Sequence, residues 1–218
     1  MSLKQELAEY RAGWFKRVPA ARQLIMERHI AQLRDGLAKT ALKVGDRAPS
    51  IVLGNAKGET VDVSALLKKG PVVVVFYRGG WCPYCNLELR AFQRLLPKIE
   101  AAGASLVAIS PEKPDDSLST AEKNALTFQV LSDVGQKVGR AFRLVYDFSD
   151  ELKSAYNGFG LDIPAKNGAA DEWALPLAAT YVIDRDGVII YAYTDADYRD
   201  RADPDEILKF LTSVSVVA

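Results

Sequence analysis

The sequence has few of the residues that bind metal ions or cross-link a chain. Its 218 residues include two cysteines and one histidine, His29. Two cysteines exclude a scaffold with several disulfides and a zinc site with four cysteine ligands. One histidine argues against a histidine-rich metal centre, and against Ser–His or Cys–His catalysis unless His29 itself takes part. We therefore expect neither a metal ion nor a cofactor.

Excess charge and long apolar segments are also missing. The 28 lysines and arginines balance 28 aspartates and glutamates, so the net charge is zero. Without net positive charge, the chain has no overall field that attracts nucleic acid or an anionic membrane. The longest purely aliphatic run is residues 72–75, far below the roughly 20 apolar residues of a transmembrane helix. The sequence therefore predicts no nucleic-acid partner and no membrane partner.

The first residues do not resemble a secretory signal, because they include acidic side chains and no apolar run. The expected compartment is the reducing cytoplasm. In that compartment a C-x-x-C motif is more often catalytic than structural.

The periodicity of the sequence divides the chain in two. Residues 1–42 predict a helical N-terminal extension of two helices, because apolar residues recur at helical spacing in both halves. The second helix begins after Pro19, and His29 is expected on its surface. From residue 43 to 218, strand-like and helical runs alternate, which is typical of an α/β domain. The extension is expected to pack on this domain or on a second subunit, which would make a homodimer.

Within the α/β part, the pattern predicts an early hairpin, two central strands, a late hairpin and several helices. The longest expected helix runs from Pro83 to Ala101, and a shorter one is expected near Thr120 to Ala125. The last helix begins after Asp203, a good N-cap followed by proline. Residues 157–176 show weak periodicity and are expected to form a loop.

The residues with the clearest chemistry lie at one turn, F-Y-R-G-G-W-C-P-Y-C, residues 76–85. A buried strand runs into two glycines, and a helix then begins near Cys82. Cys85 follows at i+3, so both sulfurs face the same way. The free N–H groups and the dipole of a helix N-terminus favour thiolate over thiol, and Arg78 adds positive charge. Such a dithiol exchanges with disulfides or attacks peroxides.

Less specific interpretations apply to the same residues. A lone C-x-x-C is half of a zinc site, but completing it would require a dimer that shares the metal. Free cysteines are also commonly buried core residues. Trp81 either packs or shields a thiolate at Cys82. Glu88 is either solvated or a buried carboxylate that moves protons or holds an arginine.

The sequence from V-G-D-R-A-P, residues 44–49, to the late V-I-D-R-D-G resembles the alkyl hydroperoxide reductase/thiol-specific antioxidant family, the peroxiredoxins. It is most similar to peroxiredoxin-like members that carry C-P-Y-C and a helical N-terminal extension. The resemblance covers nearly the whole chain. It implies a thioredoxin-like fold, in which a central mixed sheet is flanked by helices and the active cysteine lies at a helix start.

Two branches of this fold suggest different roles for the cysteines. The resemblance to peroxiredoxins places the peroxidatic cysteine at Cys85 and the Thr/Ser position of that motif at Cys82. The family's active-site arginine position holds Ala178, so Arg78 or another arginine is needed in its place. In thioredoxins and glutaredoxins that position holds a cis-proline facing the dithiol, and Pro176 lies two residues earlier. By that resemblance Cys82 is the nucleophile and Cys85 resolves.

The leading hypothesis is a thiol-dependent peroxidase that reduces hydrogen peroxide or organic hydroperoxides through a Cys82/Cys85 dithiol–disulfide cycle. Thioredoxin, glutaredoxin or glutathione would then reduce the disulfide. The alternative is a thioredoxin- or glutaredoxin-like thiol–disulfide oxidoreductase without peroxidase activity. A third hypothesis is a redox-switched interaction protein. The role of the charged run at residues 195–201 is left open between a solvated loop and an approach to the active site.

Overall fold

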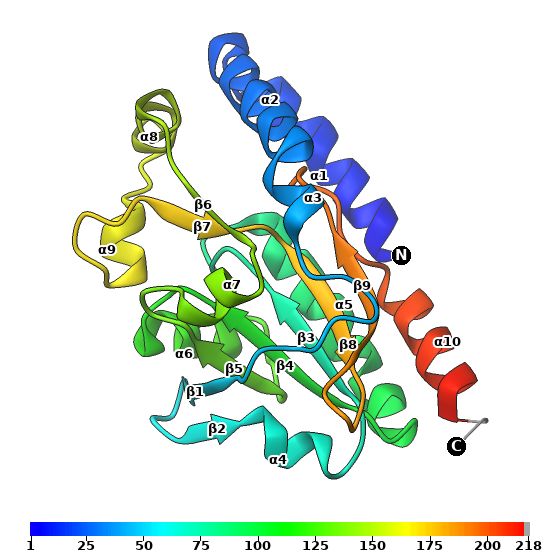
Figure 1. The fold of residues 1–218 in the computed structure, drawn as a ribbon. Coiled ribbons are helices and arrows are strands. Elements are labelled where there is room, and N and C mark those ends of the chain that lie inside the picture. The colour runs from blue at the N-terminus through cyan, green and yellow to red at the C-terminus, as the bar shows by residue number, and fades with distance from the viewer. Residues whose placement is uncertain (216–218) are drawn as a thin grey trace.

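The computed structural model describes residues 1–215 and has a seven-stranded mixed sheet at its centre (Figure 1). The strand order is β2-β1-β5-β4-β3-β8-β9. The middle strand β3 pairs in parallel with β4 and antiparallel with β8. A separate two-stranded sheet pairs β6 with β7. The strands are β1 (Val52–Asn55), β2 (Thr60–Asp62), β3 (Val72–Phe76), β4 (Ser105–Ser110), β5 (Gln129–Ser132), β6 (Val145–Asp147), β7 (Ala174–Pro176), β8 (Ala179–Ile183) and β9 (Ile189–Thr194).

Helices flank the sheet, and the longest, α5, follows directly from the turn after β3. In Figure 1 the two N-terminal helices lie over the upper end of the sheet. The helices are α1 (Leu3–Arg17), α2 (Ala20–Asp35), α3 (Leu37–Thr40), α4 (Val63–Leu67), α5 (Pro83–Ala101), α6 (Pro114–Lys123), α7 (Lys137–Ala141), α8 (Asp150–Asn157), α9 (Ile163–Asn167) and α10 (Pro204–Ser215). Within residues 1–215, no helix is long and apolar enough to cross a membrane.

Strand β3 is buried on both faces, as its continuous apolar run predicts. Because side chains alternate along a strand, its residues divide between two cores. Val72, Val74 and Phe76 belong to one core, with side chains from α2, α7 and α8. Val73 and Val75 belong to the other, with side chains from α1, α5 and α10. The turn after β3 therefore emerges from the most constrained strand of the sheet.

Most of the expected elements are present, and the α/β fold class is confirmed. Two expectations are wrong. The segment 157–176 is not a loop throughout, because it contains α9 and the short strand β7. The helix expected near Thr120 begins earlier, at Pro114, whose fixed φ suits the first turn of a helix. These elements have 3 to 10 residues, too few for apolar periodicity to identify them.

The N-terminal extension contributes side chains to both cores. Leu3 and Leu7 of α1 pack in the core of α5 and α10. Met26 and Ile30 of α2, each 2% exposed, pack in the core on the other face of the sheet. His29 does not lie on the surface as expected. Its ring is 4.8 Å from the ring of Tyr146, and burial together with the charge of Arg78 lowers its pKa to about 4.

Replacing one of these buried side chains tests whether α2 belongs to the folded core. Ile30→Ala should lower the free energy of unfolding by about 2–5 kcal/mol, because it removes a fully buried side chain and leaves a cavity. Leu24→Ala on the same helix is the control, since Leu24 is 53% exposed and surface changes stay within about 0.5 kcal/mol. Urea unfolding measures both. Equal effects would show that α2 does not share the core.

Candidate active site

The two cysteines lie at the start of α5, as expected from the sequence. Cys82 is the N-cap of the helix, Pro83 is its first residue and Cys85 lies in its first turn. Both are free thiols, and they are 1% and 0% exposed. The helix N-terminus favours a negative charge at the N-cap sulfur. The N-cap position therefore makes Cys82 a better place for a thiolate than Cys85.

The glycines before the dithiol allow a turn that other residues would not fit. Gly79 has a φ of +148°, a conformation that favours glycine. A Cβ at Gly80 would lie 1.9 Å from the Thr120 hydroxyl. The backbone N–H of Gly80 donates to the buried Glu112 carboxylate over 2.8 Å. Burial raises the pKa of Glu112 to about 7, although the bond from Gly80 lowers it.

Arg78 places a buried positive charge next to Cys82. Its Nη1 lies 3.7 Å from the Cys82 Sγ, and its Nη2 donates to the Tyr156 hydroxyl. The guanidinium is also 4.1 Å from the centroid of the Tyr198 ring and 5.0 Å from that of Trp81. Aromatic faces stabilise a cation that has left water. Trp81 thus contacts the arginine and also adjoins Cys82 in the chain.

A second arginine, Arg201, places a charge next to Cys85. Its Nη2 lies 3.3 Å from the Cys85 Sγ, and its Nε donates to Glu88 over 2.8 Å. Arg201 and Glu88 are each 1% exposed as side chains. Of the two interpretations of Glu88, the structure therefore favours a buried carboxylate that holds an arginine.

These contacts give the two thiols opposite acidities. The pKa of Cys82 falls to about 5, because a hydrogen bond from Cys85 and the charges of Arg78 and Arg201 outweigh the burial that raises it. Burial, the hydrogen bond to Cys82 and the charge of Cys82 all raise the pKa of Cys85. Burial also raises the pKa of Glu88 to about 8, although Arg201 opposes the rise. These directions make Cys82 the more acidic thiol of the pair.

Ala178, which occupies the family's active-site arginine position, lies near two other residues expected at the site. Pro176, Ala178 and Arg78 line the same small void. Residues 1–215 contain no cis peptide bond, so Pro176 is trans, and it pairs with Val145 in the two-stranded sheet. It is not among the residues that line the pocket at Cys82. Arg78, rather than Pro176, thus lies at both the void and the dithiol.

A pocket of about 340 Å³ opens in front of Cys82. Half of its lining residues are aromatic, and part of the lining comes from the N-terminal helices. Its lining consists of Tyr10, Trp14, Arg17, Val18, Met26, Arg78, Trp81, Cys82, Pro83, Tyr84, Tyr156, Phe159, Leu161 and Tyr198. Cys85 is absent from this lining, so a molecule in the pocket meets Cys82 first.

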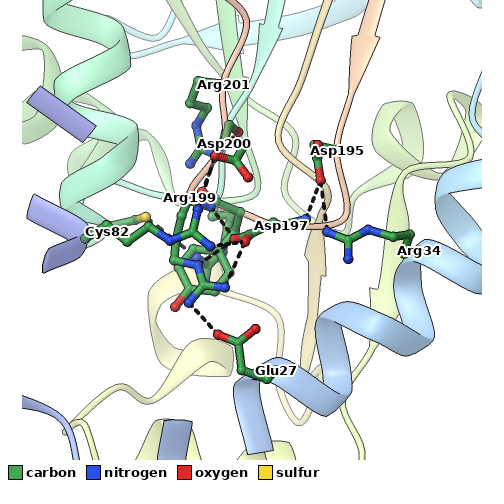
Figure 2. Close-up of polar contacts among 11 residues, drawn as sticks. Glu27, Arg34, Cys82, Asp195, Asp197, Arg199, Asp200 and Arg201 are labelled. Carbon is green, nitrogen blue, oxygen red and sulfur yellow. Dashed lines mark hydrogen bonds and ion pairs between the residues drawn. The ribbon is translucent and has the colours of Figure 1, made fainter. Parts of the chain in front are cut away.

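Of the two alternatives left open for the loop 195–201, the structure supports an approach to the active site. The loop places Tyr198 against Arg78 and Arg201 against Cys85, and sequence reasoning had not singled out either residue. Figure 2 shows how the loop is held between the body of the protein and α2. The signal was the alternation of acidic and basic residues, which is typical of internal ion pairs as well as of solvated loops.

Buried ion pairs hold this loop. Arg199, whose side chain is 0% exposed, donates to Asp197 with Nε over 2.7 Å and with Nη2 over 2.8 Å. Its Nη1 lies 2.7 Å from the Glu27 carboxylate of α2 (Figure 2). Arg11 of α1 pairs with Asp197 at 3.2 Å and with Asp200 at 3.4 Å. Both N-terminal helices are therefore tied by charge to the loop that supplies Arg201.

Comparison with known proteins identifies the family. The sequence pattern of the AhpC/TSA family matches residues 44–192. The chain belongs to the AhpC/TSA family. It is 31% identical over 170 residues to the chloroplastic peroxiredoxin Q of Populus jackii, covering 78% of this chain and 68% of the relative. It is 30% identical over 184 residues to that of Sedum lineare, covering 84% and 86%.

The fold agrees with this membership. The crystal structure of peroxidoxin BcpB from Mycobacterium tuberculosis superposes with a TM-score of 0.63 at 23% identity, covering 79% of this chain and 98% of that one. The expected thioredoxin-like fold is thereby confirmed. The AhpC/TSA match ends before residue 195 and begins after the N-terminal helices. Arg201, Tyr198 and the α1–α2 wall of the pocket therefore lie outside the matched region.

The acidity of Cys82 should depend on Arg78. Alkylation of Cys82 should have its midpoint well below the ordinary pKa of a thiol and slow at lower pH, where the thiolate becomes protonated. Arg78→Met removes the adjacent cation and should move the midpoint upward by about one pH unit or more. The rate is measured in a Cys85→Ser background, so that Cys82 is the cysteine that reacts. Arg28→Met, at a largely exposed arginine, is the control. A midpoint unmoved by Arg78→Met would contradict this account.

The loop should depend on its buried ion pair for stability. Arg199→Met leaves the buried Asp197 with only Arg11 as a cationic partner and should cost about 3–5 kcal/mol in the free energy of unfolding. Arg28→Met breaks an exposed pair with Glu151 and should cost less than about 1 kcal/mol. Chemical denaturation compares the two variants. A cost for Arg199→Met as small as that of its control would mean that the loop is held by other contacts.

Proposed function

We propose that the protein is a thiol-dependent peroxidase in which Cys82 attacks the peroxide and Cys85 resolves the product. One observation carries the assignment of roles: Cys82 is the acidic thiol and lines the pocket, whereas Cys85 lies outside that lining with a raised pKa. Membership of the AhpC/TSA family and the peroxiredoxin names of the relatives support the peroxidase activity.

In the first step the Cys82 thiolate attacks the terminal oxygen of R–O–O–H. The S–O bond forms as the O–O bond breaks, so sulfur is oxidised to a sulfenic acid and the peroxide is reduced to R–OH, or to water from hydrogen peroxide. The departing oxygen gains negative charge and takes up a proton. Arg78, 3.7 Å from the attacking sulfur, supplies N–H groups that stabilise this charge. Arg78 thus takes the role of the family's active-site arginine, whose position holds Ala178 in this chain.

In the second step Cys85 attacks the sulfur of the sulfenic acid. The S–S bond forms, the hydroxyl leaves, and the proton of the Cys85 thiol leaves with it as water. Arg201, 3.3 Å from the Cys85 sulfur, stabilises the negative charge that develops there. Glu88 holds Arg201 in this position through the 2.8 Å contact. A positioning role for Glu88 thus accounts for a buried carboxylate beside the dithiol.

The cycle closes when a thiol reductant reduces the Cys82–Cys85 disulfide by exchange. Thioredoxin, glutaredoxin and glutathione are the candidate reductants. We place the first reductant thiolate on Cys82, because that sulfur faces the pocket. Homodimer formation and a cytoplasmic location stay predictions, which sedimentation of the reduced protein and fractionation of the native cells test.

A second candidate function is thiol–disulfide exchange without a peroxide step. It is favoured by the N-cap position of Cys82 and by the W-C-P-Y-C motif, which resembles thioredoxins and glutaredoxins. The redox-switched interaction protein is the weaker alternative, because a switch alone does not need an acidic thiol at a substrate-sized pocket.

Rapid mixing of reduced protein with hydrogen peroxide and with cumene hydroperoxide tests these assignments. Trp81, next to Cys82, should report oxidation through its fluorescence. The wild type should react far faster than free cysteine and end as an intramolecular disulfide. Cys85→Ser should react as fast but stop one oxygen heavier, as the sulfenic acid. Cys82→Ser should lose the fast reaction.

Intact mass of each end product identifies the species. Fast oxidation that survives in Cys82→Ser and disappears in Cys85→Ser would reverse the two roles and restore those of the family motif. Peroxide reaction no faster than that of free cysteine, together with rapid reduction of a disulfide substrate through Cys82, would establish the second candidate function.

A further inference from the structure

The N-terminal helices form one wall of the pocket at Cys82. We propose that this wall makes the active site selective for bulky apolar organic hydroperoxides over hydrogen peroxide, with Trp14 as the main specificity-determining residue. The inference rests on the proposed peroxidase function and adds a substrate preference to it. The wall comes from α1 and α2, through Tyr10, Trp14 and Met26.

The pocket is much larger than hydrogen peroxide needs. A single water requires about 10–15 Å³ of accessible volume in a cavity, and hydrogen peroxide has only one oxygen more. The pocket at Cys82 provides about 340 Å³. A substrate that fills it therefore carries a substituent of many carbon atoms on the peroxide group.

The lining determines the chemistry of that substituent. Beside Tyr10 and Trp14, the side chains of Tyr84, Tyr156, Phe159 and Leu161 surround the space. The lining includes two cations. Arg78, next to the sulfur, contacts the Tyr156 hydroxyl and the Tyr198 ring, and the Arg17 guanidinium lies 5.4 Å from the centroid of the Tyr10 ring. Pockets of this composition bind ligands by burying apolar surface. The fitting occupant is a hydroperoxide whose O–O group meets Cys82 and whose aryl or branched alkyl group contacts Trp14 and Phe159.

The wall is a fixed part of the fold. Leu3 and Leu7 anchor α1 in the core of α5, and Ile30 anchors α2 in the opposite core. The Arg11–Asp197 and Glu27–Arg199 ion pairs add contacts from both helices to the loop 195–201. The Arg199 guanidinium also lies 5.6 Å from the centroid of the Trp14 ring. Trp14 is therefore held in place before a substrate arrives.

This selectivity belongs to segments outside the AhpC/TSA match. That match covers residues 44–192, so Tyr10, Trp14, Met26 and Tyr198 all lie beyond it. The reacting sulfur and Arg78 lie within it. The chain thus combines reactive groups from the matched region with a substrate wall from its own N-terminus, and the two contributions are separable by mutation.

The test compares cumene hydroperoxide with hydrogen peroxide on the full-length protein. Removing contacts equal to a methylene group from an apolar pocket changes kcat/KM by about 10–200-fold. Trp14→Ala should therefore lower kcat/KM for cumene hydroperoxide by about 10-fold or more, and change that for hydrogen peroxide much less. The ratio of the two values is the readout, because a general loss of folded protein lowers both alike.

Two further variants control the experiment. Trp14→Phe keeps an aromatic face and should restore most of the ratio. Leu24→Ala, at an exposed position on α2 that does not line the pocket, should leave the ratio unchanged. A Trp14→Ala protein with an unchanged ratio would overturn the selectivity. If the wild type reacts with neither peroxide faster than free cysteine does, the peroxidase function itself fails.

Discussion

The site depends on two guanidinium groups buried beside the dithiol. A charge taken out of water is costly unless it finds a partner, so each arginine requires its own surroundings. Arg78 lies among aromatic rings and next to Cys82, while Arg201 pairs with Glu88 and lies next to Cys85. An anionic sulfur at Cys82 is therefore part of what stabilises Arg78, whereas Arg201 relies on the Glu88 carboxylate. The low pKa of Cys82 and the burial of both arginines are two aspects of one electrostatic balance.

Maintaining that balance involves segments far apart in the chain. Arg201 and Tyr198 come from the loop 195–201, and that loop is held by Glu27 of α2 and Arg11 of α1. The central sheet supplies the turn at Gly79 and the start of α5. Because Glu27 and Arg11 pair with the loop that carries Arg201, the helical extension helps to position a residue that contacts Cys85. The extension thus bears on the chemistry of the dithiol as well as on its pocket.

Sequence reasoning located the dithiol because the evidence for it is local. A buried strand, two glycines and a proline after Cys82 predict a helix start within a few residues, and the structure has one there. Arg201 was out of reach, since its contact with Cys85 spans 116 positions in the chain. The ion pairs within 195–201 also resemble those of a solvated loop in their sequence. The loop is paired with α1 and α2. Apolar periodicity predicts that these helices form, but it does not predict where they pack.

The proposed roles of the two cysteines rest on geometry, because the family motif and the thioredoxin-like motif disagree about them. The family position of the peroxidatic residue is Cys85, one turn inside the helix, and its neighbour in this chain is a second thiol at the N-cap. Two adjacent thiols cannot both ionise readily, because the first thiolate raises the pKa of the second. The N-cap sulfur takes the charge, since it accepts a hydrogen bond from the other thiol and lies beside Arg78. In the proposed function, a cysteine in place of the usual hydroxyl moves the reactive sulfur one turn outward, to the wall of the pocket that the N-terminal helices complete.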